Sequence, residues 1–354
     1  MKLCLDPKLA FFSPTYFIAD IAANHDGSLK RALELIRLAA ESGADAAKFQ
    51  NFRAETIVSR KGFQELGGKL THQASWKKDV YEVYQDAALP MDWTEALRAE
   101  CLKVGIDYFT APYDLDYIDF FSELMPYFKI GSGDITWKKA IIQIAKHGKP
   151  VLIATGASEM SEVDAAVQLL KSYDIPIVLM QCNTNYTGNE ENFDHLNLRV
   201  LQEFQRKFPE VILGFSDHSQ GHVAVLGAVS LGARAVEKHF TDDVNREGPD
   251  HQFSLDPKMW RKMVDDTRIL ERCLGDGVKT VEANEKEARI VQRRALRFKM
   301  DFPKNHILAE DDLIALRPCP IDGVTPFEIE SIVGKRLINP VNRDDLVRRI
   351  NIED

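Results

Sequence analysis

Short apolar runs that end in polar residues recur along most of the chain, and amphipathic stretches separate them. The first run is Tyr16 to Ile21, followed by a periodic apolar stretch from Ser28 to Glu41 and a second run from Asp45 to Phe49. Apolar runs of this length between polar loops are typical of strands buried on both faces of a parallel sheet. The pattern predicts a repeating unit of strand, loop and helix.

The unit repeats until eight strands and eight helices are predicted. The other strands are predicted at 106–109, 127–130, 151–154, 177–180, 211–213 and 235–238, and the other helices near 91–104, 114–124, 138–147, 159–172, 195–207, 219–231 and 257–274. Eight such pairs close a parallel sheet into a (β/α)8 TIM barrel. An open doubly wound sheet is the alternative, but no GxGxxG fingerprint follows the first strand. We predict an α/β fold with a TIM barrel.

The pattern changes after the last predicted barrel helix. Gly275 and Gly277 interrupt it, the charged stretch 281–294 predicts a linker helix, and short strands with turns follow. We therefore predict a barrel domain at 1–280, which begins with a short strand or hairpin, a linker at 281–294 and a small domain at 295–354.

Segment 51–90 is longer than the usual connection between a strand and its helix. Loops of that length inside a compact domain are often functional. The run 71–78 is expected to cover a ligand or to contact a partner. The alternative is a solvated excursion with Trp76 packed against the barrel.

Composition excludes several classes of protein. The 354 residues are 45% hydrophobic, and the net charge of −9 argues against a nucleic-acid surface. The five cysteines are scattered without CxxC spacing, which disfavours a disulfide scaffold or a zinc ribbon. No stretch offers about 20 uninterrupted apolar residues for a membrane span. We expect a soluble, cytoplasmic protein that binds neither nucleic acid nor membrane.

Polar residues gather where the predicted strands end. A TIM barrel predicts this, because the loops after its strands form the active-site face. The endings are Asn24 to Gly27, Lys48 to Gln50, Thr110 to Pro112, Lys129 to Asp134, Ala154 to Gly156, Gln181 to Tyr186, Ser216 to His218 and Glu237 to His239.

His218 and His239 end two consecutive predicted strands, so both are expected at one mouth of the barrel. Two imidazoles so placed can hold one metal ion and leave positions open for water and substrate, as in a catalytic site. Manganese, magnesium, cobalt and zinc are all chemically possible. The alternative is a pair of histidines whose hydrogen bonds are satisfied in polar loops.

Three lysines also end apolar strands: Lys48, Lys129 and Lys238. A lysine there needs an anion or a carboxylate partner to offset its desolvation. Three of them around one mouth favour an anionic ligand. The alternative is an ion pair for each lysine with one of the acids Asp20, Asp134 and Glu237.

Ser132 lies between two glycines, in a turn where backbone N–H groups and a hydroxyl can approach phosphate oxygens without a Cβ in the way. A plain tight turn is the alternative.

The ordered set of these motifs resembles the N-acetylneuraminate (sialic acid) synthase family, including its legionaminate and pseudaminate types. KIGSGD from Lys129, SDHS from Ser216, EKHF from Glu237 and the run Gly248 to Asp250 match in order and spacing, and the likeness runs from Phe17 to the C-terminus. The resemblance implies condensation of phosphoenolpyruvate with an open-chain N-acetylated hexose to a nine-carbon sugar acid, with release of phosphate. The hexose would be N-acetylmannosamine or a 6-deoxy di-N-acetyl hexose, and Lys77 or Lys78 is a possible contact for a phosphorylated one.

The same resemblance implies a divalent metal, Mn²⁺ with Mg²⁺ or Co²⁺ as alternatives. It also implies that the small C-terminal domain is antifreeze-like (SAF) and caps the barrel of the other protomer, in a domain-swapped homodimer. Arg317 matches an arginine that reaches the sugar site of that protomer.

Roles follow from the resemblance residue by residue. His218 and His239 match the metal ligands, and Lys129 matches the group that holds the carboxylate of phosphoenolpyruvate. Asp20 is our candidate for handling the added water or its proton. The phosphate contacts match Thr110, Ser132 and Ser216, and the sugar site matches Lys48, Gln50, Tyr186 and Asp250. Supporting roles fall to Asn24, His25, Glu237 and Lys238.

The chain departs from the family pattern in four places. Asp20 and Asp134 stand where glutamates are usual, which shortens each carboxylate by one methylene and leaves the sugar undecided. Ala154 removes a hydroxyl that Thr155 can replace as a phosphate contact. The order of residues after Cys182 is changed, so either Asn183 or Asn185 contacts the ligand, and we take Asn183 forward.

Two other classes of function remain open at this point. A Schiff-base aldolase acting on a sialic-acid-like sugar would use a barrel lysine as its nucleophile, whereas the paired histidines favour a metal. A non-catalytic sugar-binding protein would need neither a phosphate-suited turn nor a pair of metal ligands.

Overall fold

The computed structural model describes residues 2–5, 13–66, 73–74 and 76–353. The chain divides into two compact units, Met1–Gly275 and Asp276–Asp354. The predicted N-terminal hairpin falls largely on residues outside the described ones.

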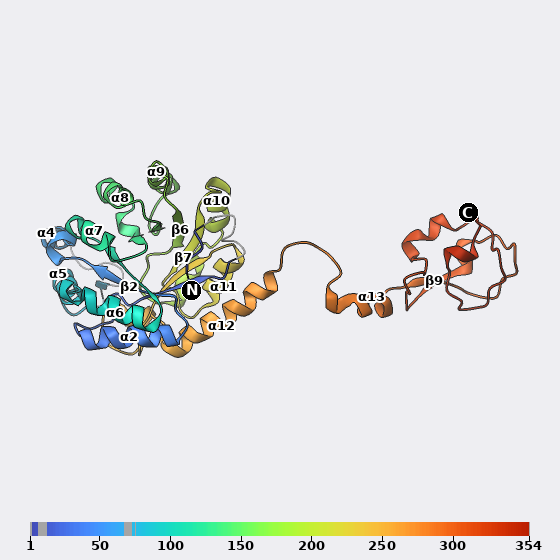
Figure 1. Ribbon diagram of the computed structural model, residues 1–354, viewed down its shortest axis with the longest axis horizontal. Helices are drawn as coiled ribbons and strands as arrows, with labels where there is room; N and C mark the ends of the chain where they lie inside the picture. The colour runs from blue at the N-terminus through green and yellow to red at the C-terminus, as the bar shows by residue number, and fades with distance from the viewer. Residues whose placement is uncertain (1, 6–12, 67–72, 75, 354) are drawn as a thin grey trace. The chain divides into compact units, whose positions relative to one another are not determined.

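The first unit is built on eight parallel strands (Figure 1). Their hydrogen-bonded order is β3-β2-β1-β8-β7-β6-β5-β4, and β3 and β4 lie side by side, which closes the sheet. The predicted (β/α)8 TIM barrel is confirmed. The strands are Tyr16–Asp20 (β1), Ala46–Asn51 (β2), Asp107–Pro112 (β3), Phe128–Ile130 (β4), Val151–Ala154 (β5), Ile177–Cys182 (β6), Ile212–Asp217 (β7) and Ala235–His239 (β8).

Helices surround the strands, as Figure 1 shows. Asp256 caps α12 by accepting a hydrogen bond from the backbone N–H of Met259 at 2.8 Å, and Pro257 occupies its first turn. The barrel helices are Leu29–Glu41 (α2), Thr94–Val104 (α6), Leu115–Ser122 (α7), Lys138–Ala145 (α8), Met160–Lys171 (α9), Val200–Lys207 (α10), Val223–Ser230 (α11) and Pro257–Leu274 (α12).

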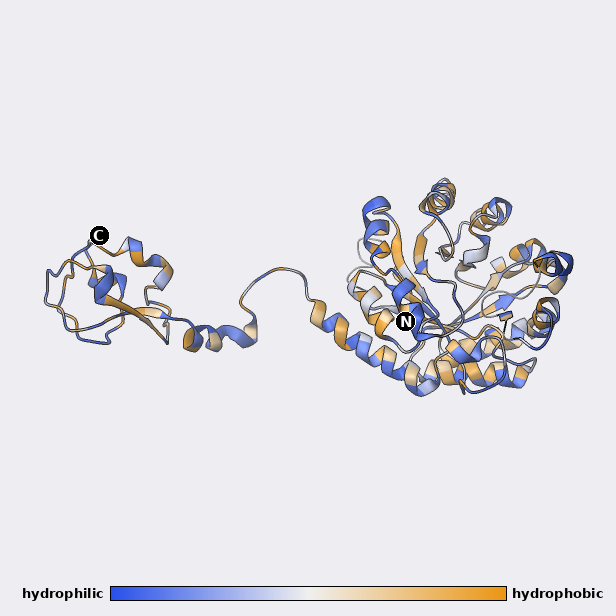
Figure 2. Cartoon of the chain, turned by 180° about the vertical axis from the view of Figure 1, so that it is seen from behind, coloured by the Kyte–Doolittle hydropathy of each residue, from blue (hydrophilic) through white to orange (hydrophobic). Residues whose placement is uncertain are grey.

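The strands are buried on both faces, which is why they read as apolar runs. Every residue of β1, β5, β6, β7 and β8 is buried. Figure 2 shows hydrophobic residues along the strands and mixed stripes on the helices that cover them. Removing this apolar surface from water is the main driving force for the fold.

Strand register decides which side chains reach the mouth of the barrel. Asp20 pairs with both Lys48 and His239, so all three point to the same side of the sheet. Ser216 pairs with Glu237 in the same way. Because successive residues of a strand face opposite sides, their immediate neighbours point outward toward the helices.

Segment 51–90 is an excursion with helices of its own. It contains Ala54–Ile57 (α3), Arg60–Glu65 (α4) and Val80–Ala87 (α5), and the short helix Met91–Trp93 leads from it into α6. Part of the run 71–78 lies outside the described residues, but Trp76 is described.

The second unit has its own hydrophobic core. It starts with Ala283–Glu285 and helix Lys286–Gln292 (α13), followed by an antiparallel pair of strands, Ala295–Phe298 (β9) and Leu313–Leu316 (β10). The rest of the unit consists of turns and short 3₁₀ helices. Its core includes Leu296, Phe298, Leu308, Val324, Ile332, Leu337 and Val347.

The search for membrane-crossing helices found none among the described residues, since no helix there is both long and apolar enough.

Candidate active site

A cavity of about 390 Å³ opens at the C-terminal ends of the barrel strands. It lies where a TIM barrel is expected to hold its active site. Most of the residues predicted from the sequence line it: Asp20, Lys48, Gln50, Lys129, Ser132, Asp134, Tyr186, Ser216, His218, His239 and Asp250.

A buried cluster of two lysines and two acids forms the floor of the cavity. The Nζ atom of Lys48 lies 2.7 Å from Oδ2 of Asp20 and 3.4 Å from Oε1 of Glu237. The Nζ atom of Lys129 lies 3.2 Å from the same Glu237 oxygen. All four side chains are at most 5% exposed. The ion-pair alternative therefore holds for Lys48 and Lys129, which also line the cavity.

Burial and pairing shift the pKa values of the cluster in different directions. Burial disfavours the charged form of Glu237, but Lys129 and Lys48 outweigh it and lower the pKa of Glu237 to about 2. Burial also opposes the charge on Lys48, yet Asp20 and Glu237 raise its pKa. For Asp20 burial prevails over Lys48 and raises the pKa. Glu237 is therefore the anchor of the cluster, because it contacts both lysines and helps to raise the pKa of Lys48.

The two histidines come together at the mouth, with ring centroids 5.3 Å apart. Nδ1 of His218 lies 2.8 Å from the backbone oxygen of Asn183. Because a carbonyl only accepts, Nδ1 carries the proton and Nε2 keeps its lone pair. Nε2 of His239 lies 3.5 Å from Asp20, and its Nδ1 is buried without a hydrogen-bond partner among the described residues.

These histidines suit a divalent cation. Burial lowers the pKa of each to about 3, so both rings are neutral near pH 7, the form that ligates metals. A buried ring nitrogen without a partner is also the atom that a cation would satisfy. The described residues contain no group of three or more His, Cys, Asp or Glu side chains arranged to hold a metal. A bound cation would thus have two imidazole ligands and open positions.

Glycines let the turn after β4 approach its neighbours. A Cβ on Gly156 would collide with Thr184 and lie 2.9 Å from Oγ of Ser132, and one on Gly131 would lie 2.5 Å from the hydroxyl oxygen of Tyr113. Gly156 donates its backbone N–H to Oγ of Ser132 at 3.0 Å. The serine hydroxyl is thereby fixed at the cavity wall, and the bulk of a side chain is excluded beside it.

Aromatic side chains form another wall of the cavity. Phe52 and Tyr84 have ring centroids 5.4 Å apart, Phe52 and Tyr113 are 6.3 Å apart, and Trp76 and Tyr84 are 6.4 Å apart. Tyr186 packs on the ring of His218 with centroids 4.2 Å apart. The cavity thus has a charged floor and an aromatic side.

Three residues of the barrel that were predicted to contact the substrate do not line the cavity. Thr110 points to the outer side of the sheet, with Phe49, and donates to Oδ1 of Asn51 at 2.7 Å. Thr155 is buried and donates to the backbone oxygen of Met180. Asn183 is half-buried, and its side-chain amide donates to the backbone oxygen of His195 at 3.1 Å. Arg317 is an exposed residue of the second unit, and its contact with the sugar site of a partner chain stays a prediction.

Lys238 corrects the expectation of three lysines at one mouth. It is fully buried and bonds to Asp217, at 2.7 Å, and to the backbone of Ser219. It alternates with Glu237 and His239 on β8, which face the cavity, so Lys238 must face away. Only Lys48 and Lys129 remain to meet an anion there.

The sequence pattern assigned too small a role to one cavity residue and did not identify several others. Glu237 was given a supporting role, although its position two residues before His239 places it on the same face of a strand. Tyr113 directly follows β3, a position that pointed to the mouth. Phe52 and Tyr84 carried no such signal, because they lie in the excursion between β2 and α6.

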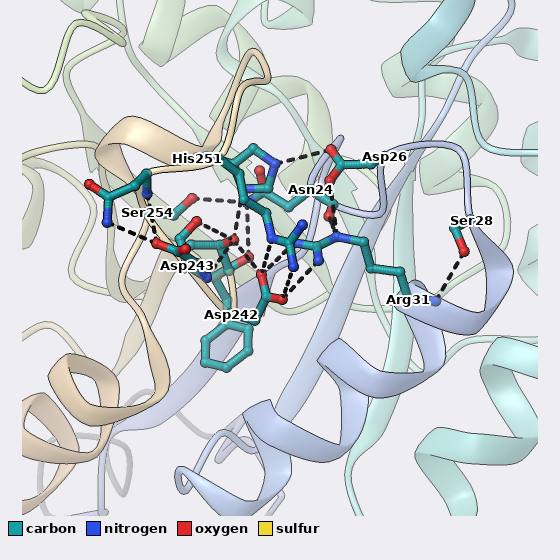
Figure 3. Close-up of polar contacts among 12 residues, drawn as sticks. Asn24, Asp26, Ser28, Arg31, Asp242, Asp243, His251 and Ser254 are labelled. Atoms are coloured by element: carbon teal, nitrogen blue, oxygen red, sulfur yellow. Dashed lines mark hydrogen bonds and ion pairs between the residues drawn. The ribbon is translucent and has the colours of Figure 1, made fainter.

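A network of charged and polar side chains braces one rim of the cavity (Figure 3). Arg31 and Arg246 both bind Asp242, each with one N–O distance of 2.8 Å. His251 lies 3.0 Å from Oδ1 of Asp26. The loop after β1 is thereby tied to the segment after β8.

The network leads to Asp250 in the cavity wall. Ser254 donates its hydroxyl to the backbone oxygen of Asp250 at 2.6 Å, and Oδ2 of Asp250 accepts the backbone N–H of Ala23 at 3.1 Å. Asn24 donates to both Ser254 and the backbone of Phe240 at 2.9 Å. Asp250 is therefore held from both loops.

Residues 35–279 match the model of the NeuB family, and this span is more than half of the chain. The chain belongs to the NeuB family. This NeuB-family chain is 32% identical over 338 residues to N,N'-diacetyllegionaminic acid synthase of Campylobacter jejuni, covering 94% of this chain and 99% of that protein. It is 31% identical over 348 residues to human N-acetylneuraminate-9-phosphate synthase, covering 98% and 95%.

A solved structure agrees with these relatives. The crystal structure of N-acetylneuraminic acid (sialic acid) synthetase from Leptospira borgpetersenii, in complex with citrate, superposes with a TM-score of 0.69 and 29% identity. The match covers 78% of this chain and 90% of that one. The resemblance inferred from the motifs is confirmed: the NeuB-family chain is an enzyme, a sugar acid synthase whose homologues make nonulosonic acids.

Proposed function

We propose that this NeuB-family enzyme condenses phosphoenolpyruvate with an open-chain N-acetylated hexose to a nine-carbon 2-keto sugar acid and releases phosphate. The observation that carries the proposal is one cavity that combines paired lysines, a glycine-flanked serine and two neutral histidines. The paired lysines and the glycine-flanked serine suit an anion that carries carboxylate and phosphate.

His218 and His239 are the residues that would hold a divalent cation, Mn²⁺ or alternatively Mg²⁺ or Co²⁺. When bound, such an ion supplies Lewis-acid polarisation of the aldehyde oxygen of the acceptor. The hydrogen bond from His218 to the backbone of Asn183 fixes the orientation of that ring, and burial keeps both rings unprotonated.

The donor lies at the charged floor. Lys129 binds the carboxylate of phosphoenolpyruvate, and the hydroxyls of Ser132 and Ser216 donate to its phosphate. Ser216 and Lys129 now share Oε1 of Glu237 as their partner, at 3.3 and 3.2 Å, so Glu237 keeps both in place before the donor arrives. Preorganisation of this kind lowers the cost of orienting the donor.

The reaction makes one C–C bond and one C–O bond, the latter to water, and breaks the C–O bond to phosphate. The methylene carbon of phosphoenolpyruvate attacks the aldehyde carbon, which leaves an oxocarbenium at the carbon that bears the phosphate. Water adds to that carbon and loses a proton, and the former aldehyde oxygen takes up a proton to become a hydroxyl. The C–O bond to phosphate then breaks, and the new hydroxyl loses its proton to the departing phosphate and becomes the keto oxygen. Asp20, held by Lys48 and by Nε2 of Gln50 at 2.7 and 3.2 Å, is the carboxylate that takes the proton of the water.

We extend the proposal to a homodimer, and this part of it rests only on the resemblance to the synthase family. The second unit is assigned as the antifreeze-like domain, which covers the barrel of a partner in a domain-swapped homodimer. Arg317 would then hydrogen-bond the N-acyl oxygen of the sugar bound by that partner.

The test follows the consumption of phosphoenolpyruvate and the release of phosphate with Mn²⁺ and N-acetylated hexoses. We expect turnover that stops on chelation. We also expect His218→Ala to abolish turnover, while its circular dichroism stays that of the wild type. His147→Ala, which removes a histidine outside the cavity that stacks on Phe128, serves as the matched control and should stay active. A fully active His218→Ala enzyme would refute the metal assignment.

A Schiff-base aldolase predicts a different result. It needs a neutral amine, whereas Asp20 and Glu237 raise the pKa of Lys48 in spite of its burial. Borohydride should therefore trap no substrate adduct on a lysine, and a trapped adduct would replace the synthase mechanism with the aldolase one.

A further inference from the structure

Strand β3 does not offer the cavity a hydroxyl from the residue that was predicted to supply one. Thr110 faces the outer side of the sheet and donates to Asn51. Ala111 pairs with Gln50 and faces the cavity with it, but it has no polar side-chain atom. Because successive residues alternate, Tyr113 is the next residue on the inner side. Its backbone N–H donates to the backbone oxygen of Asn51 at 2.9 Å, so the strand pairing continues to this position.

The ring of Tyr113 reaches from the end of β3 to the turn after β4. A Cβ on Gly131 would lie 2.5 Å from the hydroxyl oxygen of Tyr113 and 3.0 Å from its Cε1 atom. Only a residue without a side chain leaves room for the phenol there. The ring also packs against Phe52, with centroids 6.3 Å apart. The hydroxyl of Tyr113 therefore lies beside the residue that precedes Ser132.

This hydroxyl is available to a ligand. Tyr113 lines the cavity, and its hydroxyl forms no hydrogen bond to another described residue. The oxygen is not among the fully buried polar atoms without a partner, so it is open to the cavity. Burial, with the carboxylates of Asp134 and Asp20, raises the pKa of Tyr113 well above its usual range. The phenol thus keeps its proton at neutral pH and can donate it in a hydrogen bond.

The turn beside this hydroxyl is the one proposed to hold the phosphate of the donor. Oγ of Ser132 accepts the backbone N–H of Gly156, which leaves its own proton free to donate into the cavity. A second hydroxyl on the other side of Gly131 suits an oxygen of the same anion, since hydrogen bonds to a charged acceptor are the strong ones.

We propose that Tyr113 is a further binding residue for phosphoenolpyruvate, whose hydroxyl donates to a phosphate oxygen at the turn after β4. Tyr113 then supplies from the end of β3 the hydroxyl that Thr110 does not. The inference rests on the proposed function and adds a residue to its donor site.

Tyr113→Phe tests this, because it removes the hydroxyl and keeps the ring. Steady-state kinetics of the full-length enzyme with Mn²⁺ and an N-acetylated hexose are measured with each substrate varied in turn. We expect the KM for phosphoenolpyruvate to rise ~10-fold, the ratio that ~1.4 kcal/mol gives, and the KM for the hexose to stay unchanged. Calorimetric titration with phosphoenolpyruvate alone should show the same weakening of Kd. Tyr117→Phe removes a hydroxyl outside the cavity, on a ring that Arg53 covers, and should match the wild type in all three quantities.

Two results would overturn the inference and leave the proposed function standing. One is an unchanged KM and Kd for phosphoenolpyruvate in Tyr113→Phe. The other is a rise in the KM for the hexose alone, which would assign Tyr113 to the acceptor. A wild-type enzyme without turnover would count against the proposed function instead, and the calorimetric Kd would still decide whether Tyr113 binds this anion.

The contact with Gly131 provides a second test. Gly131→Ala places a methyl group where the hydroxyl of Tyr113 lies. The KM for phosphoenolpyruvate should therefore rise more in the wild-type background than in Tyr113→Phe, where the hydroxyl is missing. A Cβ on Gly133 meets nothing within 4 Å, so Gly133→Ala should change this KM by the same factor in both backgrounds. Equal effects of Gly131→Ala in the two backgrounds, with wild-type circular dichroism, would contradict the placement of the hydroxyl at the turn.

Discussion

Glu237 is the residue on which the floor of the cavity depends. One of its oxygens contacts Lys48, Lys129 and Ser216, while the other, Oε2, has no hydrogen-bond partner among the described residues. Breaking a buried pair by removing one partner is far more costly than replacing both, because the remaining charge stays buried alone. Glu237 therefore holds both lysines by ion pairs, and it helps to raise the pKa of Lys48.

Asp250 gives a prediction about stability. An ordinary aspartate titrates near pH ~3.9, whereas burial raises the pKa of Asp250 to about 6. Between these values the folded state holds more protons than the unfolded state, so this group costs stability as the pH rises through the window and the full cost applies above it. Asp250→Asn removes that cost.

The melting temperature of the barrel transition checks this. The difference between Asp250→Asn and the wild type should become more positive from pH 4.5 to pH 7.5, by about 2–4 °C, which corresponds to ~1 kcal/mol in a domain of this size. The exposed Asp92→Asn should show no such trend. A difference that stays constant with pH would mean that Asp250 is not desolvated by its surroundings.

At this scale the sequence predicts which residues lie near the cavity better than it predicts the side of the sheet that each side chain faces. Asp20, Lys48, His218 and His239 were found because they end apolar runs. Thr110 has the same signal and nevertheless faces outward, since β3 continues to Pro112 and Thr110 alternates with its neighbours. Which side of a sheet a residue faces depends on register, and register is a property of two strands rather than of one.

At the scale of elements, the strands could be predicted because each is buried on both faces and therefore continuously apolar. The residues at which the strands end were harder to predict. Strand β7 was predicted to stop at Leu213 but continues to Asp217, because Ser216 and Asp217 pair with Glu237 and Lys238 of β8. Polar residues at the end of a strand look like a loop until the neighbouring strand is known.

Helix α5 allows a prediction about one element. Asp79 accepts the backbone N–H of Glu82 at 2.8 Å, and Glu82 accepts the backbone N–H of Asp79 at 3.2 Å, which is a capping box. Asp79→Ala should destabilise this end of α5 by ~0.5–2 kcal/mol. Because α5 carries Val83 and Tyr84, the KM for the acceptor should rise severalfold while the KM for phosphoenolpyruvate stays unchanged.

Steady-state kinetics with each substrate varied in turn checks this. Glu82→Gln retains a side chain that can complete the capping box and should behave like the wild type. An equal rise of both KM values in Asp79→Ala would show that α5 does not act on the acceptor alone.

At the scale of the whole molecule, the chain consists of two units with separate cores. A core of its own lets a small unit keep its structure while it contacts another subunit. The proposed domain swap makes a prediction that can be tested only with two variants combined in one dimer. Arg317→Ala should raise the KM for the acceptor, and His218→Ala should be inactive.

Mixed dimers of these two variants should recover activity. In such a dimer the intact barrel of the Arg317→Ala chain receives the second unit of the His218→Ala chain, which retains Arg317. The two variants are denatured together, refolded and assayed at low acceptor concentration, where wild-type KM should reappear in part of the sample. A mixture of His218→Ala and His239→Ala has no intact barrel and should stay inactive. If the first mixture shows only the activity of Arg317→Ala, the second unit acts within its own chain or not at all.

The apolar side chains that line the cavity and its charged floor come from different parts of the chain. The two lysines and two acids of the floor come from four strands, β1, β2, β4 and β8, whereas the apolar side chains Phe52, Ile57, Trp76, Val83, Tyr84 and Ala87 lie within residues 52–87. Under the proposed function, inherited changes in that one stretch would alter which sugar is accepted and leave the residues proposed to bind phosphoenolpyruvate undisturbed. The proposed acceptor specificity can therefore change in evolution through substitutions in a single excursion, while the chemistry at the floor stays the same.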